Sequence, residues 1–123
     1  MDKIKKYDSG LTLIVNEGGA KSCFANIMAG VGSSSETKEI YGISHYIEHM
    51  NFKGTKRFSA FDISSEMEKL GTTFNAYTST EVTDFYVHSL EENLERSFDI
   101  LTDLVFNSVY SDDEAAKEKG VII

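Results

Sequence analysis

Two histidines and a glutamate stand close together in the segment His45-Tyr46-Ile47-Glu48-His49. On an α-helix, residues three and four positions apart project from the same face, so these three side chains converge. Two neutral imidazoles at this spacing can bind one Zn²⁺ ion at about 2.0–2.1 Å, with a third protein ligand and a water completing the coordination. The ion makes the water acidic, and Glu48 can take its proton as a general base. The spacing therefore predicts a zinc-hydrolase site on one helix.

The order of the three groups is H-x-x-E-H, the reverse of the more familiar H-E-x-x-H and the signature of inverzincin metallopeptidases. Reversal along a helix leaves the geometry usable. The alternative is that His45 and His49 are ordinary residues on the polar face of an amphipathic helix. Five residues alone do not decide between these interpretations, so the surrounding sequence matters.

Three further segments accompany the motif: Gly42-Ile43-Ser44 before it, Met50-Asn51-Phe52-Lys53-Gly54-Thr55 after it, and Gly71-Thr72-Thr73-Phe74-Asn75-Ala76-Tyr77-Thr78 later in the chain. Together with the motif, they resemble the pitrilysin/insulinase family of zinc peptidases, which includes the mitochondrial processing peptidases. The resemblance runs from the Asp8-Ser9-Gly10-Leu11 turn to Ile123, and several ordered motifs at family-like spacing make it specific.

This resemblance implies a role for particular residues. His45 and His49 match the two zinc-binding histidines, and Glu48 matches the catalytic base. In the family a glutamate roughly 75 residues after the second histidine is the third zinc ligand, and that position falls just beyond Ile123. Glu118 matches a second glutamate on the same helix, two turns before that ligand, which supports the catalytic site; the alternative is a solvent-facing charge.

The resemblance also implies where a peptide substrate binds. Phe52 matches a position lining the pocket for the residue after the scissile bond, although an aromatic residue here can equally belong to the core. Asn75, Ala76 and Tyr77 match the strand that pairs with extended substrate through backbone hydrogen bonds. An edge strand can serve in this way, whereas a central strand cannot.

The elements that must position these residues form an α+β pattern. The metal-binding helix is expected over residues 43–51, ending near Gly54, and Ser59 is the expected N-cap of a second helix. Antiparallel strands are expected over 4–7 and 11–16 as a hairpin, over 22–29 inside a sheet, and over 72–78 and 83–90 as a second hairpin.

Two more helices follow in the sequence. Leu94, Phe98, Leu101 and Val105 recur at helical spacing and predict one core-facing stripe, and the segment from Ser111 to Glu114 has a capping-box pattern that predicts another helix start. His88 is expected to be a sheet residue rather than a ligand. We therefore expect an antiparallel β-sheet packed by helices, as in the first domain of a processing-peptidase-like fold.

The overall composition is that of one globular domain, with 123 residues, 41% hydrophobic residues and a net charge of −8. The charge disfavours nucleic acid and anionic membranes as partners. The single cysteine, Cys23, is expected in a buried strand. No apolar run is long enough for a signal peptide or a membrane span, which makes the cytoplasm the default location.

The sequence thus predicts residues 1–123 to be the partial N-terminal catalytic domain of a zinc-dependent metalloendopeptidase, cut within a helix and inactive alone. The alternatives are a non-catalytic processing or binding subunit of the same fold and a truncated, inactive chain. The expected partners are a peptide substrate and a C-terminal half or partner subunit. A homodimer is also expected, through apolar surface left uncovered around Val121-Ile122-Ile123.

Overall fold

The computed structural model describes residues 2–122, with side chains described for residues 2–120. Its strands and α-helices alternate in short groups along the chain, joined by three 3₁₀ turns, η1 (Ser33–Ser35), η2 (Lys38–Ile40) and η3 (Glu91–Asn93). The order is β1 (Asp2–Lys6), β2 (Thr12–Asn16), β3 (Ser22–Ala29), α1 (Ile43–Asn51), α2 (Ala60–Lys69), β4 (Thr73–Thr78), β5 (Thr83–Leu90), α3 (Leu94–Phe106) and α4 (Asp112–Ile122). The predicted α+β class is confirmed, with all strand pairs antiparallel.

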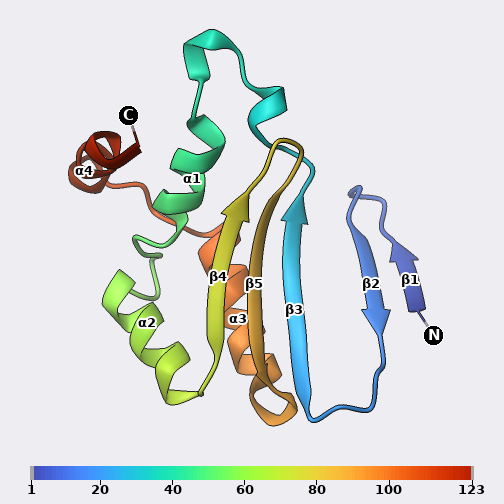
Figure 1. Cartoon of the computed structure of the whole chain (residues 1–123). Coiled ribbons are helices and arrows are strands. Elements are labelled where there is room, and N and C mark those ends of the chain that lie inside the picture. Colours follow the sequence, from blue (N-terminus) through green and yellow to red (C-terminus); the bar gives the residue numbers. More distant parts are fainter. Residues whose placement is uncertain (1, 123) are drawn as a thin grey trace.

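The strands form two separate sheets in the part of the chain described. β1 and β2 pair as a hairpin, with Ile4 opposite Ile14, and the other three strands form a sheet in the order β3-β5-β4. Within that sheet Ala25 of β3 pairs with Val87 of β5, and Ala76 of β4 pairs with Phe85 of β5. Figure 1 shows the hairpin standing apart from the larger sheet on its β3 side.

The hydrophobic core lies between one face of the larger sheet and the helices α2 and α3 (Figure 1). Its fully or nearly buried members come from β5, α2 and α3, namely Ile63, Met67, Phe85, Val87, Ile100, Leu101 and Leu104. β5 contributes inward-facing residues at every second position, as a strand with one covered face must. Because β5 is central, β4 occupies one edge of this sheet and is free to meet α1.

The stripe expected on α3 is confirmed except at one position. Leu101 is buried and Val105 packs against the core, but Phe98 is 39% exposed, and the buried face also includes Ser97 and Leu104. Ser97 exchanges a 2.7 Å hydrogen bond with Thr72, which satisfies both hydroxyls inside the core. A hydrophobic pattern counts serine as polar and so leaves it out of the predicted stripe.

The expectation that residues 22–29 lie inside a sheet is wrong for this structure. β3 is an edge strand of the three-stranded sheet, and its outward-facing residues are exposed. Cys23 is half-buried rather than buried. The small and apolar composition of β3 therefore reflects one covered face and one open face that carries Phe24 and Met28.

The ends of the helices follow local capping chemistry. Ser59 caps α2, accepting from the Asp62 N–H while Asp62 accepts from the Ser59 N–H, both at 3.1 Å. Ser111 accepts from the Glu114 N–H at the start of α4. These contacts confirm two predicted helix starts. Among the described residues, no helix has the length and apolar character needed to cross a lipid bilayer.

The tip of the β4–β5 hairpin is fixed to the loop before α1. The N–H groups of Ser33 and Ser34 donate to the carbonyls of Ser79 and Thr80 at 3.1 and 2.8 Å. Gly32 makes this approach possible, because a Cβ there would lie 2.6 Å from the Thr80 carbonyl carbon and closer still to the Ser79 oxygen. This junction holds the end of β4 beneath α1.

The expected uncovered surface around Val121, Ile122 and Ile123 involves side chains that lie outside the described residues. Elsewhere, large hydrophobic side chains are exposed on the β1–β2 hairpin and on β3, including Ile4, Leu11, Ile14, Phe24 and Met28.

Candidate metal centre

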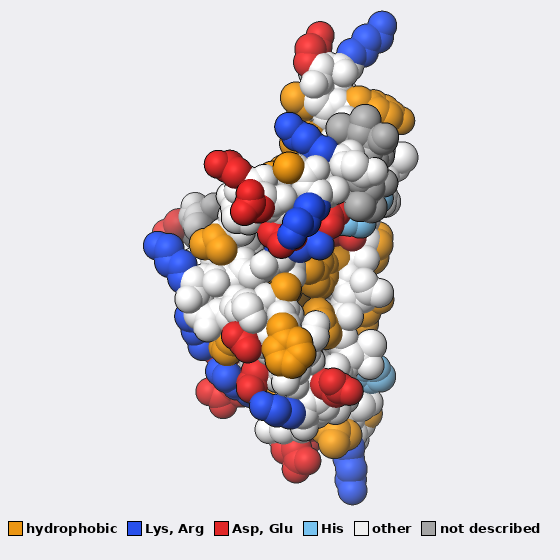
Figure 2. Space-filling model, turned by 90° about the vertical axis from the view of Figure 1, so that its left-hand side faces the viewer, with side chains coloured by type: hydrophobic (Ala, Val, Ile, Leu, Met, Phe, Trp, Pro, Cys, Tyr) orange, Lys and Arg blue, Asp and Glu red, His pale blue; other side chains and the backbone are white. Residues whose placement is uncertain are grey.

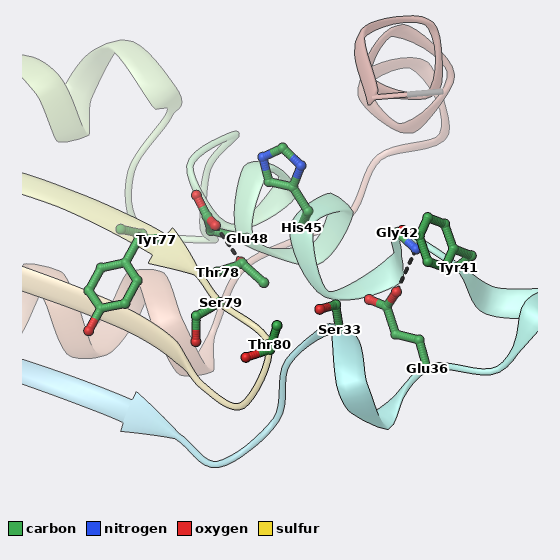
Figure 3. Close-up of a pocket in the computed structure, with 11 residues that line it drawn as sticks. Ser33, Glu36, Tyr41, Gly42, His45, Glu48, Tyr77, Thr78, Ser79 and Thr80 are labelled. Carbon is green, nitrogen blue, oxygen red and sulfur yellow. Dashed lines mark hydrogen bonds between the residues drawn. The ribbon is translucent and has the colours of Figure 1, made fainter.

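Helix α1 presents His45, Glu48 and His49 on one face, as their spacing predicts. The Nε2 atoms of the two histidines are 2.9 Å apart, and the rings meet edge to face with centroids 4.4 Å apart. One ligand atom from each of the three residues lies within 4.8 Å of the others. Figure 3 shows His45 and Glu48 projecting from α1 above the end of β4.

The donor set fits a zinc ion. Tetrahedral coordination with Zn–N bonds of about 2.0–2.1 Å requires two ligand nitrogens about 3.3 Å apart. The observed 2.9 Å separation of the Nε2 atoms reaches that value with a small rotation of either ring. Imidazole nitrogens with a neighbouring carboxylate are ligands that suit zinc. Within residues 2–120, this cluster alone brings three potential metal ligands together.

Glu118 on α4 contacts Nδ1 of the His49 ring, whereas His45 lies next to Nε2 of the same ring. Its Oε2 is 2.9 Å from His49 Nδ1, and its Oε1 is 2.7 Å from the ammonium of Lys53. Glu118 is only 5% exposed. The hydrogen bond from Lys53, followed by that from His49, outweighs burial and holds the pKa of the Glu118 carboxyl below its usual range. The alternative of a solvent-facing charge at Glu118 is therefore wrong.

This contact also defines the tautomer of a neutral His49. An ionised carboxylate can only accept hydrogen bonds, so Nδ1 carries the ring proton and Nε2 is bare. Carboxylate–histidine pairs of this kind orient metal ligands in many zinc sites. Nε2 of His49 then faces Nε2 of His45 as a lone-pair donor.

Glu48 is also fixed. It is 8% exposed, and its Oε2 accepts a short hydrogen bond from the hydroxyl of Thr78, the last residue of β4. Figure 3 shows this bond as a dashed line between α1 and the hairpin. One carboxylate oxygen is thus occupied by Thr78, and no protein donor to Oε1 is found among the described residues.

The start of α1 is organised by an unusual cap. Gly42 has a positive φ of 87°, and the carboxylate of Glu36 accepts from the N–H groups of Gly42 and Ser44 at 2.7 and 2.9 Å. These backbone hydrogen bonds, with Gly42 the larger influence, lower the pKa of Glu36. A negative charge here also suits the positive end of the helix dipole. The cap orients α1 and hence its histidines.

An open cavity with a volume of about 780 Å³ lies between α1, the loop before it and the hairpin. His45 and Glu48 line it from above, and β4 contributes Ala76, Tyr77 and Thr78 (Figure 3). The remaining lining residues are Ser33, Glu36, Tyr41, Gly42, Ser79 and Thr80. The candidate metal centre therefore opens onto the end of an edge strand.

The expected substrate strand has the required position at an edge. β4 pairs with β5 on one side only within the described sheet. The Ala76 N–H donates to the side-chain oxygen of Asn75 at 2.8 Å, so the strand satisfies this donor without a neighbouring strand. Ala76 and Tyr77 line the cavity, but Asn75 does not.

Phe52 is not brought into this cavity. It is half-buried beside the core, with ring centroids 5.9 Å from Phe74 and 6.1 Å from Phe85. Its proposed contact with substrate remains a prediction. His88 lies on the exposed face of β5, next to Phe24 and away from the metal ligands.

Sequence reasoning missed three residues of the site: Lys53, Thr78 and Glu36. Lys53 and Thr78 lie in the family-like segments, but neither their spacing nor the resemblance points to a role for them. Lys53 follows His49 by four positions, a spacing that places both on the same side of a continuing helical turn. Glu36 had no signal, because its contacts depend on how the Gly- and Ser-rich loop folds back.

Comparison with known proteins gives a consistent family. The family model for insulinase, peptidase family M16, matches residues 11–123. A Rickettsia felis protein described as an uncharacterized zinc protease is 41% identical over 121 residues, which is 98% of this chain and 29% of the relative. The beta subunit of the human mitochondrial-processing peptidase is 37% identical, again over 98% of this chain and 25% of its own length.

A solved structure shares the fold. The crystal structure of a protease from Helicobacter pylori superposes with a TM-score of 0.92 and 26% sequence identity, covering 98% of this chain and 29% of that protein. The chain therefore spans between a quarter and a third of the length of these relatives.

Proposed function

The chain belongs to the insulinase family of peptidases, peptidase family M16, and we propose that it forms the metal-binding part of a zinc metalloendopeptidase active site. The names of its relatives support peptidase chemistry and zinc as the cofactor of the family. One observation carries the proposal for this chain: the Nε2 atoms of His45 and His49 lie 2.9 Å apart on one face of α1, beside the Glu48 carboxylate.

In this proposal the metal-binding histidines and Glu48 have different roles in peptide hydrolysis. His45 and His49 hold the zinc ion, which when bound supplies Lewis acidity toward a water molecule and the scissile carbonyl. Glu48 takes a proton from the attacking water and delivers it to the leaving amine nitrogen. Thr78 occupies Oε2 of Glu48, which leaves Oε1 for the proton transfer.

The proposed substrate is an extended polypeptide that adds to the free edge of β4. In this mode of recognition, backbone hydrogen bonds align the peptide and side-chain pockets select its sequence. Support comes from the edge position of β4 and from the shared cavity, where Ala76 and Tyr77 lie with His45 and Glu48. A peptide docked along β4 would approach the metal ligands at the Thr78 end.

A second structural unit is proposed to enclose this peptide. The cavity is open, and the chain spans only 25–30% of the relatives' length. One relative is described as a subunit of a processing peptidase. Enclosure by further polypeptide, in the same protein or in a partner subunit, would exclude water from the reacting carbonyl.

Zinc binding tests the proposal directly. Competition with a chromogenic chelator should give about one zinc per chain, and His45→Ala or His49→Ala should each weaken the affinity by at least about 10-fold. His88→Ala is the matched control, because His88 is exposed on β5, and it should leave the affinity unchanged. Equal affinity in all four proteins would refute the metal centre.

A further inference from the structure

We propose that Lys53 is a positioning residue for the metal centre, which acts through Glu118 to keep the His49 imidazole in the orientation and tautomer that metal binding requires. This inference rests on the function proposed above. It assigns a task to a lysine that touches neither the expected metal position nor the cavity described with it.

The contacts form a short chain of three side chains. Lys53 Nζ lies 2.7 Å from Glu118 Oε1, and Glu118 Oε2 lies 2.9 Å from His49 Nδ1. Each carboxylate oxygen therefore has one donor, one from the C-terminal end of α1 and one from the turn that follows it. Figure 2 shows basic and acidic side chains lying next to one another on this side of the molecule.

Burial makes this arrangement more than a surface ion pair. Glu118 is 5% exposed, and the Lys53 side chain is 31% exposed. A buried carboxylate is costly unless it is paired and hydrogen-bonded. His49 alone offers one donor to a group that can accept several, so Lys53 supplies both the opposite charge and the second hydrogen bond.

The backbone around Lys53 is fixed independently of its side chain. The helical turn continues past α1, with the Lys53 N–H donating to the Met50 carbonyl at 3.1 Å. The next residue, Gly54, accepts from the Val109 N–H at 3.0 Å and forms a bridge with Ser59. Hydrogen bonds at Lys53 and at the next residue therefore fix the position from which the Lys53 side chain extends to Glu118.

The consequence concerns the proton on His49. With Glu118 held in place, Nδ1–H has an acceptor and Nε2 stays bare toward His45. Without the Lys53 contact, the carboxylate loses one of its two anchors and can leave the imidazole. The ring can then carry its proton on Nε2, and in that tautomer it cannot bind metal through Nε2.

The test compares Lys53→Met, which keeps a long unbranched side chain but removes the charge and donors, with Lys53→Arg, which keeps both. Lys56→Met is the matched control, because Lys56 is in the same loop and forms no ion pair among the described residues. Long-range ¹H–¹⁵N NMR of the metal-free chain at about pH 8, above the ordinary histidine pKa of about 6.5, reports which ring nitrogen of His49 carries the proton.

We expect one Nδ1–H tautomer in the wild-type chain, in Lys53→Arg and in Lys56→Met, and a mixture in Lys53→Met. Zinc affinity by chelator competition should fall about 10- to 100-fold in Lys53→Met and stay within about threefold in the other two variants. If Lys53→Met keeps a single Nδ1–H tautomer, the proposal is overturned, whatever happens to the affinity.

A fold check and a measurement without metal ensure that the experiment tests the role of Lys53 alone. Amide spectra check the fold of each variant, and Lys53→Leu, which also lacks both charge and donors, replaces Lys53→Met if that protein is unfolded. The tautomer is measured without metal, so it decides the role of Lys53 even if the wild-type chain fails to bind zinc. A failure of that kind would count against the proposed function alone.

Discussion

The hydroxyl of Thr78 donates a hydrogen bond to Oε2 of Glu48, although the two residues are 30 positions apart and belong to a strand and a helix. Thr78 is the last residue of β4, and Ala76 and Tyr77 of the same strand line the cavity. The strand proposed to bind substrate therefore also orients the proposed general base.

Thr78→Val should slow catalysis without weakening substrate binding. The change removes one hydrogen bond to a charged group, worth about 1.5–3 kcal/mol, and so kcat should fall about 10- to 100-fold with KM little changed. Thr78→Ser should restore most of the rate because it keeps the hydroxyl. Steady-state hydrolysis of a fluorogenic peptide, measured on the longest available form of the protein, separates kcat from KM. A rise in KM at constant kcat would contradict the positioning role.

Glu48→Gln should separate metal binding from chemistry. The amide cannot act as a general base, and peptide hydrolysis should therefore fall about 10²- to 10⁴-fold. The histidine ligands are untouched, so zinc affinity should remain within about threefold of the wild-type value. Parallel peptidase and chelator-competition measurements check this, and substantial remaining activity would exclude Glu48 as the base.

Gly32→Ala should destabilise the protein by about 1–3 kcal/mol, because the added methyl group collides with backbone of Ser79 and Thr80 rather than with a movable side chain. Gly30→Ala is the matched control, since a Cβ at Gly30 has no neighbour within 4 Å. Urea denaturation compares the two variants. Equal midpoints would show that the hairpin tip is not held against this loop in solution.

Stability should respond to acid through Asp99. The hydrogen bond from Arg57 lowers the pKa of the Asp99 carboxyl from its ordinary value of 3.8. The stabilisation is therefore fully present above about pH 4 and is lost as the pH falls through the lowered pKa. Both side chains are nearly half exposed, so Asp99→Asn should lower Tm by only about 2 °C or less.

The measurement is Tm between about pH 2 and 7, for the wild-type chain and Asp99→Asn. The difference should vanish at the acidic end and shrink in high salt. Asp8→Asn, in the exposed turn of the first hairpin, is the control. A difference that grows toward low pH would have the wrong sign for this ion pair.

Local patterns were sufficient to predict much of this fold. The spacing of His45 and His49 predicted both the helix and its common face, and α1 covers residues 43–51 as expected. Ser59 predicted the start of α2 through its capping chemistry. In each case the determining interactions are between residues a few positions apart, which a single sequence makes visible.

Contacts between residues far apart in the sequence could not be predicted from it. Ser97 faces the core because Thr72, 25 residues away, satisfies its hydroxyl. The edge position of β3 depends on which strand pairs with β5, and strand composition does not decide this. Family resemblance implied only that Glu118 supports the site. Its contacts with His49 and Lys53 depend on the packing of α4 against α1.

The edge position of β4 in the described sheet has a consequence for the kind of polypeptide that the proposed site would recognise. Backbone groups at a sheet edge can pair only with a segment whose own N–H and C=O groups are available. In a folded protein those groups are already committed to helices and sheets. A site of this design would therefore discriminate by conformational state before it discriminates by sequence, sparing native proteins and accepting segments that are unfolded, newly made or in transit.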